Sequence, residues 1–97
     1  MKLDKNLIVY INYRTNEERE MVLDIFEHLG VTWLRERLPR EVESYNAPAR
    51  FLLERGHMYK GTSCLTVAKM NGKPVIEARD LRNQWISLKR RKENEAG

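Results

Sequence analysis

The chain has 97 residues, 18 lysines and arginines, 14 aspartates and glutamates, and one cysteine, Cys64. This length predicts one domain over residues 1–97 with a single core, and a lone thiol excludes an internal disulfide, which favours a cytoplasmic location. No apolar run approaches the roughly 20 residues of a membrane span, and the N-terminus lacks the apolar segment of a secretory signal. We therefore expect no membrane contact.

The net charge is +4, and the excess is concentrated near the C-terminus. Removing the run Lys89, Arg90, Arg91 and Lys92 leaves 14 basic residues for 14 acidic residues. The basic character therefore belongs to one segment and not to the whole surface.

Residues 1–6 are polar and are expected to fray, whereas residues 7–30 predict a strand followed by a helix. Residues 7–13 are apolar on both alternating positions, which is typical of a strand in the interior of its sheet. Thr15 and Glu18 fit a capping box, with the Glu18 carboxylate reaching back to the Thr15 N–H, and Gly30 is a typical helix end. The helix is predicted over 16–29, with one apolar face formed by Val22, Ile25, Phe26 and Leu29.

The middle of the chain is less regular. A short strand is predicted at 31–34, and Pro39 predicts a short helix over 39–45 because proline suits the first helical position. Pro48 predicts a second helix over 48–55, ended by Gly56. Residues 57–63 are interpreted as a loop.

The C-terminal third predicts a hairpin and a helix. Asn71-Gly72 between two β-prone segments, 64–70 and 73–78, is a strong signal for a type I′ turn. Its register places Ile76 and Ala78 toward the core, and Pro74 suits an edge strand. A helix is expected over 80–92.

These elements predict a small α+β domain with a β-α-β start, a helical middle, a β-hairpin and a C-terminal helix. The sheet should have three or four strands, with the helices mainly on one face. The ordered core should run from about residue 7 to residue 90, with residues 93–97 disordered.

No catalytic residue, cofactor site or metal site is predicted. His57, Ser63 and Cys64 lack the spacing of a known nucleophile turn. The segment from Gly56 to Ser63 resembles a phosphate-binding loop in glycine spacing, but Lys60 precedes the second glycine when it should follow it. The two histidines and Cys64 do not have zinc-ligand spacing. The chain is therefore interpreted as non-enzymatic.

Protein contact is the first functional hypothesis. The segment 32–48 mixes aromatic residues with arginines, which are enriched at interface hot spots. A second copy could also pair with the exposed edge of 73–78, so a homodimer is an open alternative. The expected protein-binding residues are Trp33, Arg35, Arg37, Arg40, Tyr45 and Tyr59.

The sequence is thus interpreted as a small binding or regulatory protein, such as a phage- or plasmid-type inhibitor or modulator of a host nucleic-acid-handling machine. The alternative is a small DNA- or RNA-binding regulator that uses the basic C-terminal helix and the hairpin tip. Its expected contact residues are Lys69, Lys73, Arg79, Arg82, Lys89, Arg90, Arg91 and Lys92.

Overall fold

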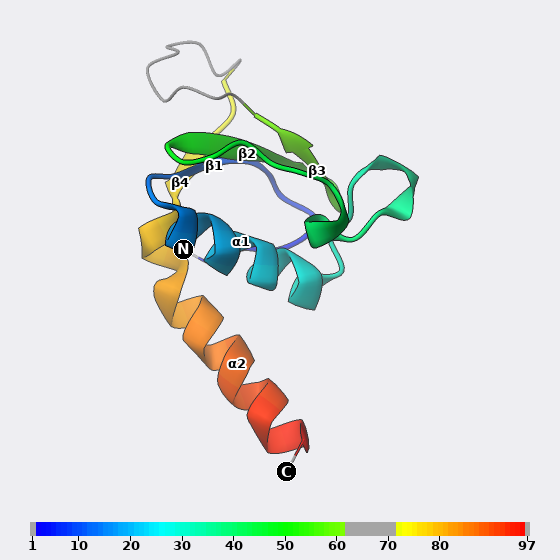
Figure 1. The fold of residues 1–97 in the computed structure, drawn as a ribbon, viewed down its shortest axis with the longest axis vertical. Helices are drawn as coiled ribbons and strands as arrows, with labels where there is room; N and C mark the ends of the chain where they lie inside the picture. The colour runs from blue at the N-terminus through cyan, green and yellow to red at the C-terminus, as the bar shows by residue number, and fades with distance from the viewer. Residues whose placement is uncertain (1, 62–71, 97) are drawn as a thin grey trace.

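The computed structural model describes residues 2–61 and 72–96 (Figure 1). The helices and strands are β1 (Ile8–Tyr13), α1 (Asn16–Leu29), β2 (Ala49–Glu54), β3 (His57–Lys60), β4 (Val75–Glu77) and α2 (Arg82–Ala96). Three short 3-10 turns join them, η1 (Leu34–Glu36), η2 (Pro39–Glu41) and η3 (Ala78–Leu81). The sheet has the strand order β3-β2-β1-β4, and α1 and α2 lie on the same side of it. The predicted α+β class is confirmed, and the sheet has four strands where three or four were predicted.

The strand β1 occupies the interior of the sheet, as its apolar composition predicted. It pairs antiparallel with β2 and parallel with β4. Val9, Ile11 and Tyr13 face the core and are buried, while the alternate residues Ile8 and Tyr10 are half-buried on the opposite face. The strand thus contributes to both faces of the sheet.

The helix α1 begins and ends where its capping residues predicted. The Glu18 N–H donates to the Thr15 hydroxyl at 3.1 Å, and Gly30 closes the helix with a φ of 77°. The Glu18 carboxylate accepts from the Arg14 N–H at 2.9 Å, and not from the expected Thr15 N–H. The reciprocal part of the predicted capping box is therefore wrong, although the N-cap itself is confirmed.

The predicted helix over 48–55 is wrong, because this segment is the strand β2. Ala49, Phe51 and Leu53 alternate into the core, and Phe51 pairs with Ile11 of β1. Arg50 faces the opposite side, where it is buried at 2% exposure and its Nε donates to Asn12 Oδ1 at 2.9 Å. Pairing with β1 satisfies both the apolar and the polar side of the segment, which a free-standing helix could not do.

The predicted loop over 57–63 is wrong at its start, because His57–Lys60 forms β3. The turn from β2 to β3 is Arg55-Gly56, and both residues have positive φ values, 49° and 88°. Two successive left-handed residues form the type I′ geometry of a tight hairpin. Gly56 therefore closes a β-turn and does not end a helix.

Two further predictions in the middle of the chain are wrong. In the segment 31–34, only Thr32 makes a strand-like contact, an isolated bridge to His57. In the segment 39–45, only Pro39–Glu41 is helical, as a single 3-10 turn. The segment 31–34 lies against β3 and the 3-10 turn lies against α1, but neither segment forms a full strand or helix of its own.

The C-terminal third follows the prediction in part. The strand β4 lies at the sheet edge, and Ile76 and Ala78 are buried, as expected. The hairpin arm at 64–70 lies outside the described residues. The helix α2 runs to Ala96, past the predicted end at residue 92 and into the segment expected to be disordered.

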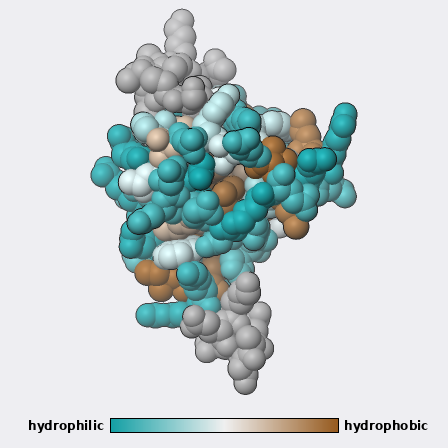
Figure 2. Space-filling view, in the orientation of Figure 1, coloured by the Kyte–Doolittle hydropathy of each residue, from teal (hydrophilic) through white to brown (hydrophobic). Residues whose placement is uncertain are grey.

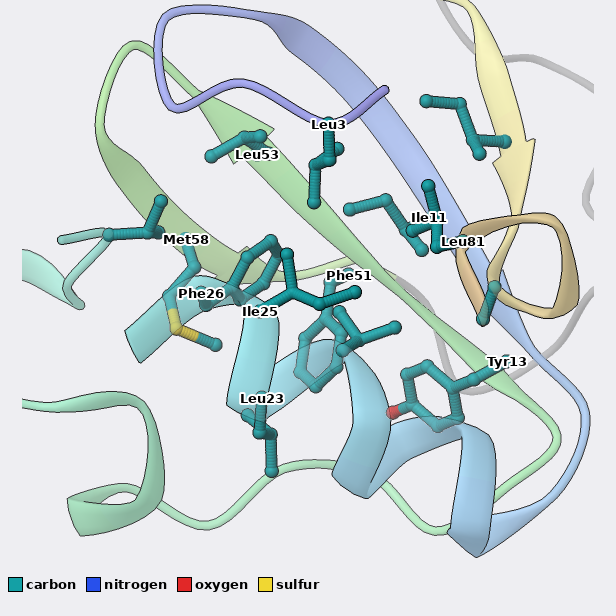
Figure 3. Packing of buried hydrophobic residues seen from close by; sticks show 14 of the residues in the cluster. Leu3, Ile11, Tyr13, Leu23, Ile25, Phe26, Phe51, Leu53, Met58 and Leu81 are labelled. Atoms are coloured by element: carbon teal, nitrogen blue, oxygen red, sulfur yellow. The ribbon is translucent and has the colours of Figure 1, made fainter. Parts of the chain in front are cut away.

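The core lies between α1 and the sheet, and Phe51 is at its centre (Figure 3). Its ring centroid is 4.8 Å from that of Tyr13, 5.7 Å from Phe26 and 6.5 Å from Trp33. The latter two contacts are edge-to-face, a favoured arrangement for aromatic rings. One β2 side chain therefore joins the sheet, α1 and the segment after α1.

The N-terminus does not fray at Leu3, contrary to the prediction. Leu3 is 1% exposed and belongs to the core. Its backbone N–H donates to Gln84 Oε1 at 2.6 Å, and its carbonyl accepts from Gln84 Nε2 at 2.7 Å. The Gln84 side chain of α2 therefore pairs with both backbone polar groups of Leu3, as the backbone of a neighbouring strand would.

Candidate functional site

Trp33 is buried at 8% exposure and is not available as a contact residue. Its indole N–H donates to the Pro39 carbonyl at 2.9 Å, and its ring packs edge-on against Phe51. Trp33 therefore links the segment that follows α1 to the core. It positions the surface around it, and it does not form that surface.

Arg40 is also engaged within the domain. Its guanidinium lies 3.2 Å from Glu20, 2.7 Å from Asp24 and 3.0 Å from Glu27, three carboxylates on successive turns of α1. Burial acts to raise the pKa of Asp24, but hydrogen bonds from Trp85 and Arg40 outweigh it, and that pKa is lowered. Arg40 thus holds η2 against α1.

Tyr45 and Tyr59 lie on different parts of the surface. Tyr45 is 39% exposed, its carbonyl accepts from the Tyr13 hydroxyl at 2.7 Å, and the Lys60 ammonium lies 5.2 Å from its ring. Tyr59 is half-buried and pairs with Leu52 on the sheet face opposite α1. The structure therefore does not bring these two predicted residues together into one patch.

Arg35 and Arg37 are exposed and form no ion pair with another described residue. They are flanked by Leu34 at 58% exposure and Leu38 at 53%, the two most exposed large hydrophobic side chains of the described chain. We call this segment the Leu34–Leu38 loop. Sequence analysis missed its two leucines, although their spacing around Arg-Glu-Arg outside any helical pattern was a visible signal.

The backbone of the Leu34–Leu38 loop is closed on itself. The Trp33 N–H donates to the Arg37 carbonyl at 2.9 Å, and the Glu36 N–H donates to the Trp33 carbonyl at 3.1 Å. Arg35 and Glu36 both have left-handed φ values, 65° and 59°. For residues other than glycine this conformation costs roughly 1–2 kcal/mol each, and such strain is concentrated at functional sites.

The loop lies at one edge of the molecule, away from α2 (Figure 1). Figure 2 shows hydrophobic surface at the same edge, bordered by hydrophilic side chains. An apolar centre with arginines at its border is the composition of a protein–protein contact. The loop is therefore the best-formed candidate contact surface of the described chain.

Among the residues predicted to contact nucleic acid, three are half-buried or have no described side chain, and five are exposed. Lys73 is half-buried before β4, Lys69 lies outside the described residues, and the side chain of Lys92 is also outside them. The others are exposed on η3 and α2, and they are Arg79, Arg82, Lys89, Arg90 and Arg91.

No family model, curated protein or solved structure matches this chain. Among the described residues, no helix has the length and apolar content needed to cross a bilayer. Over the same residues, no three histidine, cysteine, aspartate or glutamate side chains gather in a metal-binding arrangement.

Proposed function

We propose that this protein is a non-enzymatic binding module that contacts a partner protein through the Leu34–Leu38 loop. The observation that supports this most is the exposure of Leu34 and Leu38 on a closed loop between arginines that form no ion pair with another described residue. A module of this kind acts by occupying a surface, as an inhibitor or modulator of the protein it binds. Its partner would present an apolar pocket bordered by carboxylates.

The energetic argument rests on the two leucines. Fully burying one leucine contributes about 1.5–3 kcal/mol, and Leu34 and Leu38 are each a little more than half exposed. Covering both would therefore contribute roughly 2–3 kcal/mol. The Trp33 and Glu36 hydrogen bonds hold the loop closed, so little conformational entropy remains to be lost on binding.

The test compares immobilised baits in lysate of the source cell. The wild-type chain should retain a defined protein that the double variant Leu34→Ser/Leu38→Ser loses. Val75→Thr is the matched control, because Val75 is an exposed hydrophobic residue on β4, at 43% exposure. Equal retention by the wild type and the double variant would refute the proposal.

A second copy of the chain could also cover the loop, and sedimentation equilibrium distinguishes this case. A dimer that dissociates in Leu34→Ser/Leu38→Ser would identify the partner as the chain itself. A monomer at all concentrations would leave a different protein as the partner to be captured.

A further inference from the structure

The segments η3 and α2 hold more exposed cations without an ion pair than any other part of the described chain. Among the other cations, Arg14 pairs with Glu77 at 2.6 Å, Arg19 with Glu20 at 3.7 Å, and Arg40 with three carboxylates of α1. The exposed Arg35 and Arg37 of the Leu34–Leu38 loop form no ion pair with a described residue. On η3 and α2, five exposed cations form no ion pair within the described part of the chain, namely Arg79, Arg82, Lys89, Arg90 and Arg91.

Helical spacing brings three of these cations onto one face. Lys89 and Arg90 follow Arg82 by seven and eight residues, which places all three on the same side of α2. We call Arg82, Lys89 and Arg90 the α2 basic face. It spans about 12 Å along the helix at 1.5 Å per residue, and Arg79 precedes it by less than one further turn of helix.

The base of α2 is held firmly, so the basic face has a defined position. The Trp85 indole N–H donates to Asp24 Oδ2 of α1 at 3.0 Å, and the Gln84 amide exchanges two hydrogen bonds with Leu3. The Lys89 ammonium lies 4.2 Å from the Trp85 ring centroid, a cation–π contact. The domain thus orients at least one of the three charges through its own packing.

Past Leu88, α2 leaves the domain. Figure 1 shows its C-terminal half extending away from the sheet and from α1. Trp85 and Leu88 are the last apolar residues of the helix that pack against the core. A long polyanion can therefore reach the Lys89 and Arg90 end of the basic face without meeting the sheet or α1, whereas Arg82 lies in the part of α2 that packs on the domain.

From this placement we infer that the α2 basic face binds the phosphate backbone of duplex nucleic acid without reading its sequence. Each strand of a duplex carries about one phosphate per 3.4 Å of axis, so about 12 Å of helix is matched by roughly three to four phosphates of one strand. This surface is separate from the Leu34–Leu38 loop, and the inference does not depend on the proposed protein contact.

Two other polyanionic partners fit the surface less well. A membrane-surface helix needs a large free apolar face, but Trp85 and Leu88 are packed against the domain and Ile86 is half-buried. Binding an acidic protein would need an interface whose centre is apolar and depleted of charge, and the α2 basic face is defined by three charged residues. Phosphate binding needs only the charge that the α2 basic face presents.

The test is fluorescence anisotropy with a labelled random-sequence duplex DNA. Three phosphate contacts predict a slope of about −2.7 for log affinity against log salt, so binding should weaken about 40-fold between about 50 and 200 mM salt. The variant Arg82→Gln/Lys89→Gln/Arg90→Gln should bind at least about tenfold more weakly at the lower salt.

The matched control removes the same charge elsewhere. Lys5→Gln/Arg55→Gln/Lys60→Gln changes three exposed cations outside α2 and outside the Leu34–Leu38 loop and should stay within about threefold of the wild type because none contacts a phosphate. An equal loss in both triple variants would overturn the inference, as would wild-type binding that does not respond to salt. Displacement of the duplex by poly-glutamate at equal charge concentration would also overturn it, because the face would then select charge and not phosphate. Circular dichroism confirms that α2 remains helical in each variant.

Discussion

Replacing Arg35 with glycine should stabilise the domain, against the usual effect of this substitution. Arg35 is exposed in the Leu34–Leu38 loop, with φ 65° and ψ 26°, and it forms no ion pair with another described residue. Glycine adopts this left-handed conformation without steric cost, whereas a residue with a Cβ does not. The Cβ of Arg35 therefore makes the observed backbone conformation less favourable than it would be for glycine.

The magnitude follows from two opposing terms. Relief of the left-handed strain at Arg35 contributes roughly 1–2 kcal/mol, and the greater freedom of glycine in the unfolded chain costs about 0.5–1 kcal/mol. The net gain in the free energy of unfolding is about 0.5–1 kcal/mol. For a domain of this size that raises Tm by about 2–8 °C.

Arg37→Gly is the matched control, because Arg37 is exposed in the same loop but has φ −74° and ψ 138°, an ordinary extended conformation. That variant should lose about 0.5–1 kcal/mol, since no strain is relieved. Thermal and urea unfolding of both variants measure the two signs directly. If Arg35→Gly is as destabilising as Arg37→Gly, the argument from backbone strain is refuted.

Two further predictions concern the core and the N-terminus. Burial raises the pKa of Tyr13 to about 12, so one tyrosine should ionise near that pH in the ultraviolet absorbance of tyrosinate, and Tyr13→Phe should remove that step. The neutral phenol is favoured in the fold, so its stabilisation is complete below pH 10 and falls by about 2–3 kcal/mol as the pH rises from about 10 to about 12. Gln84→Ala should cost about 1–3 kcal/mol in urea unfolding, because both part-buried backbone groups of Leu3 lose their partner.

Each of these has a result that would contradict it. Complete ionisation of every tyrosine well below pH 12 in the folded protein would show that Tyr13 is accessible to solvent. For Gln84, the comparison is Asn83→Ala, an exposed neighbour on α2 that should change stability by less than about 0.5 kcal/mol. Equal losses in the two variants would mean that the contact with Leu3 does not stabilise the fold.

The first strand and helix could be predicted because their signals are local. The apolar run of β1, the Thr15 cap and the left-handed Gly30 act within a few residues of one another, and the structure confirms all three. No contact from elsewhere in the chain was needed to place them.

The strand β2 could not be predicted from the same kind of signal. Phe51 and Leu52 fit a helical pair as well as they fit opposite faces of a strand. Two contacts with residues far away in the sequence decide between helix and strand. Asn12 accepts a hydrogen bond from Arg50, and Ile11 pairs with Phe51. The segment is a strand because β1 is beside it.

The structure separates the six residues predicted for protein contact into exposed residues and residues that support the fold. Arg35 and Arg37 lie in the exposed loop, whereas Trp33 and Arg40 are used to hold that loop in place. Hot-spot composition alone does not distinguish a tryptophan that contacts a partner from one that supports the contact. The orientation of Trp33 toward Pro39 and Phe51 depends on the completed core.

The contact between Leu3 and Gln84 joins residues 81 positions apart. During synthesis, the segment around Leu3 therefore lacks this partner until residue 84 has left the ribosome. Domains with such long-range closure fold late and together rather than in stages. The C-terminal half of α2 extends away from the sheet and from α1 (Figure 1), so immobilisation at that end leaves the Leu34–Leu38 loop free in the bait experiment, whereas the duplex-binding experiment needs the chain without a tag on α2.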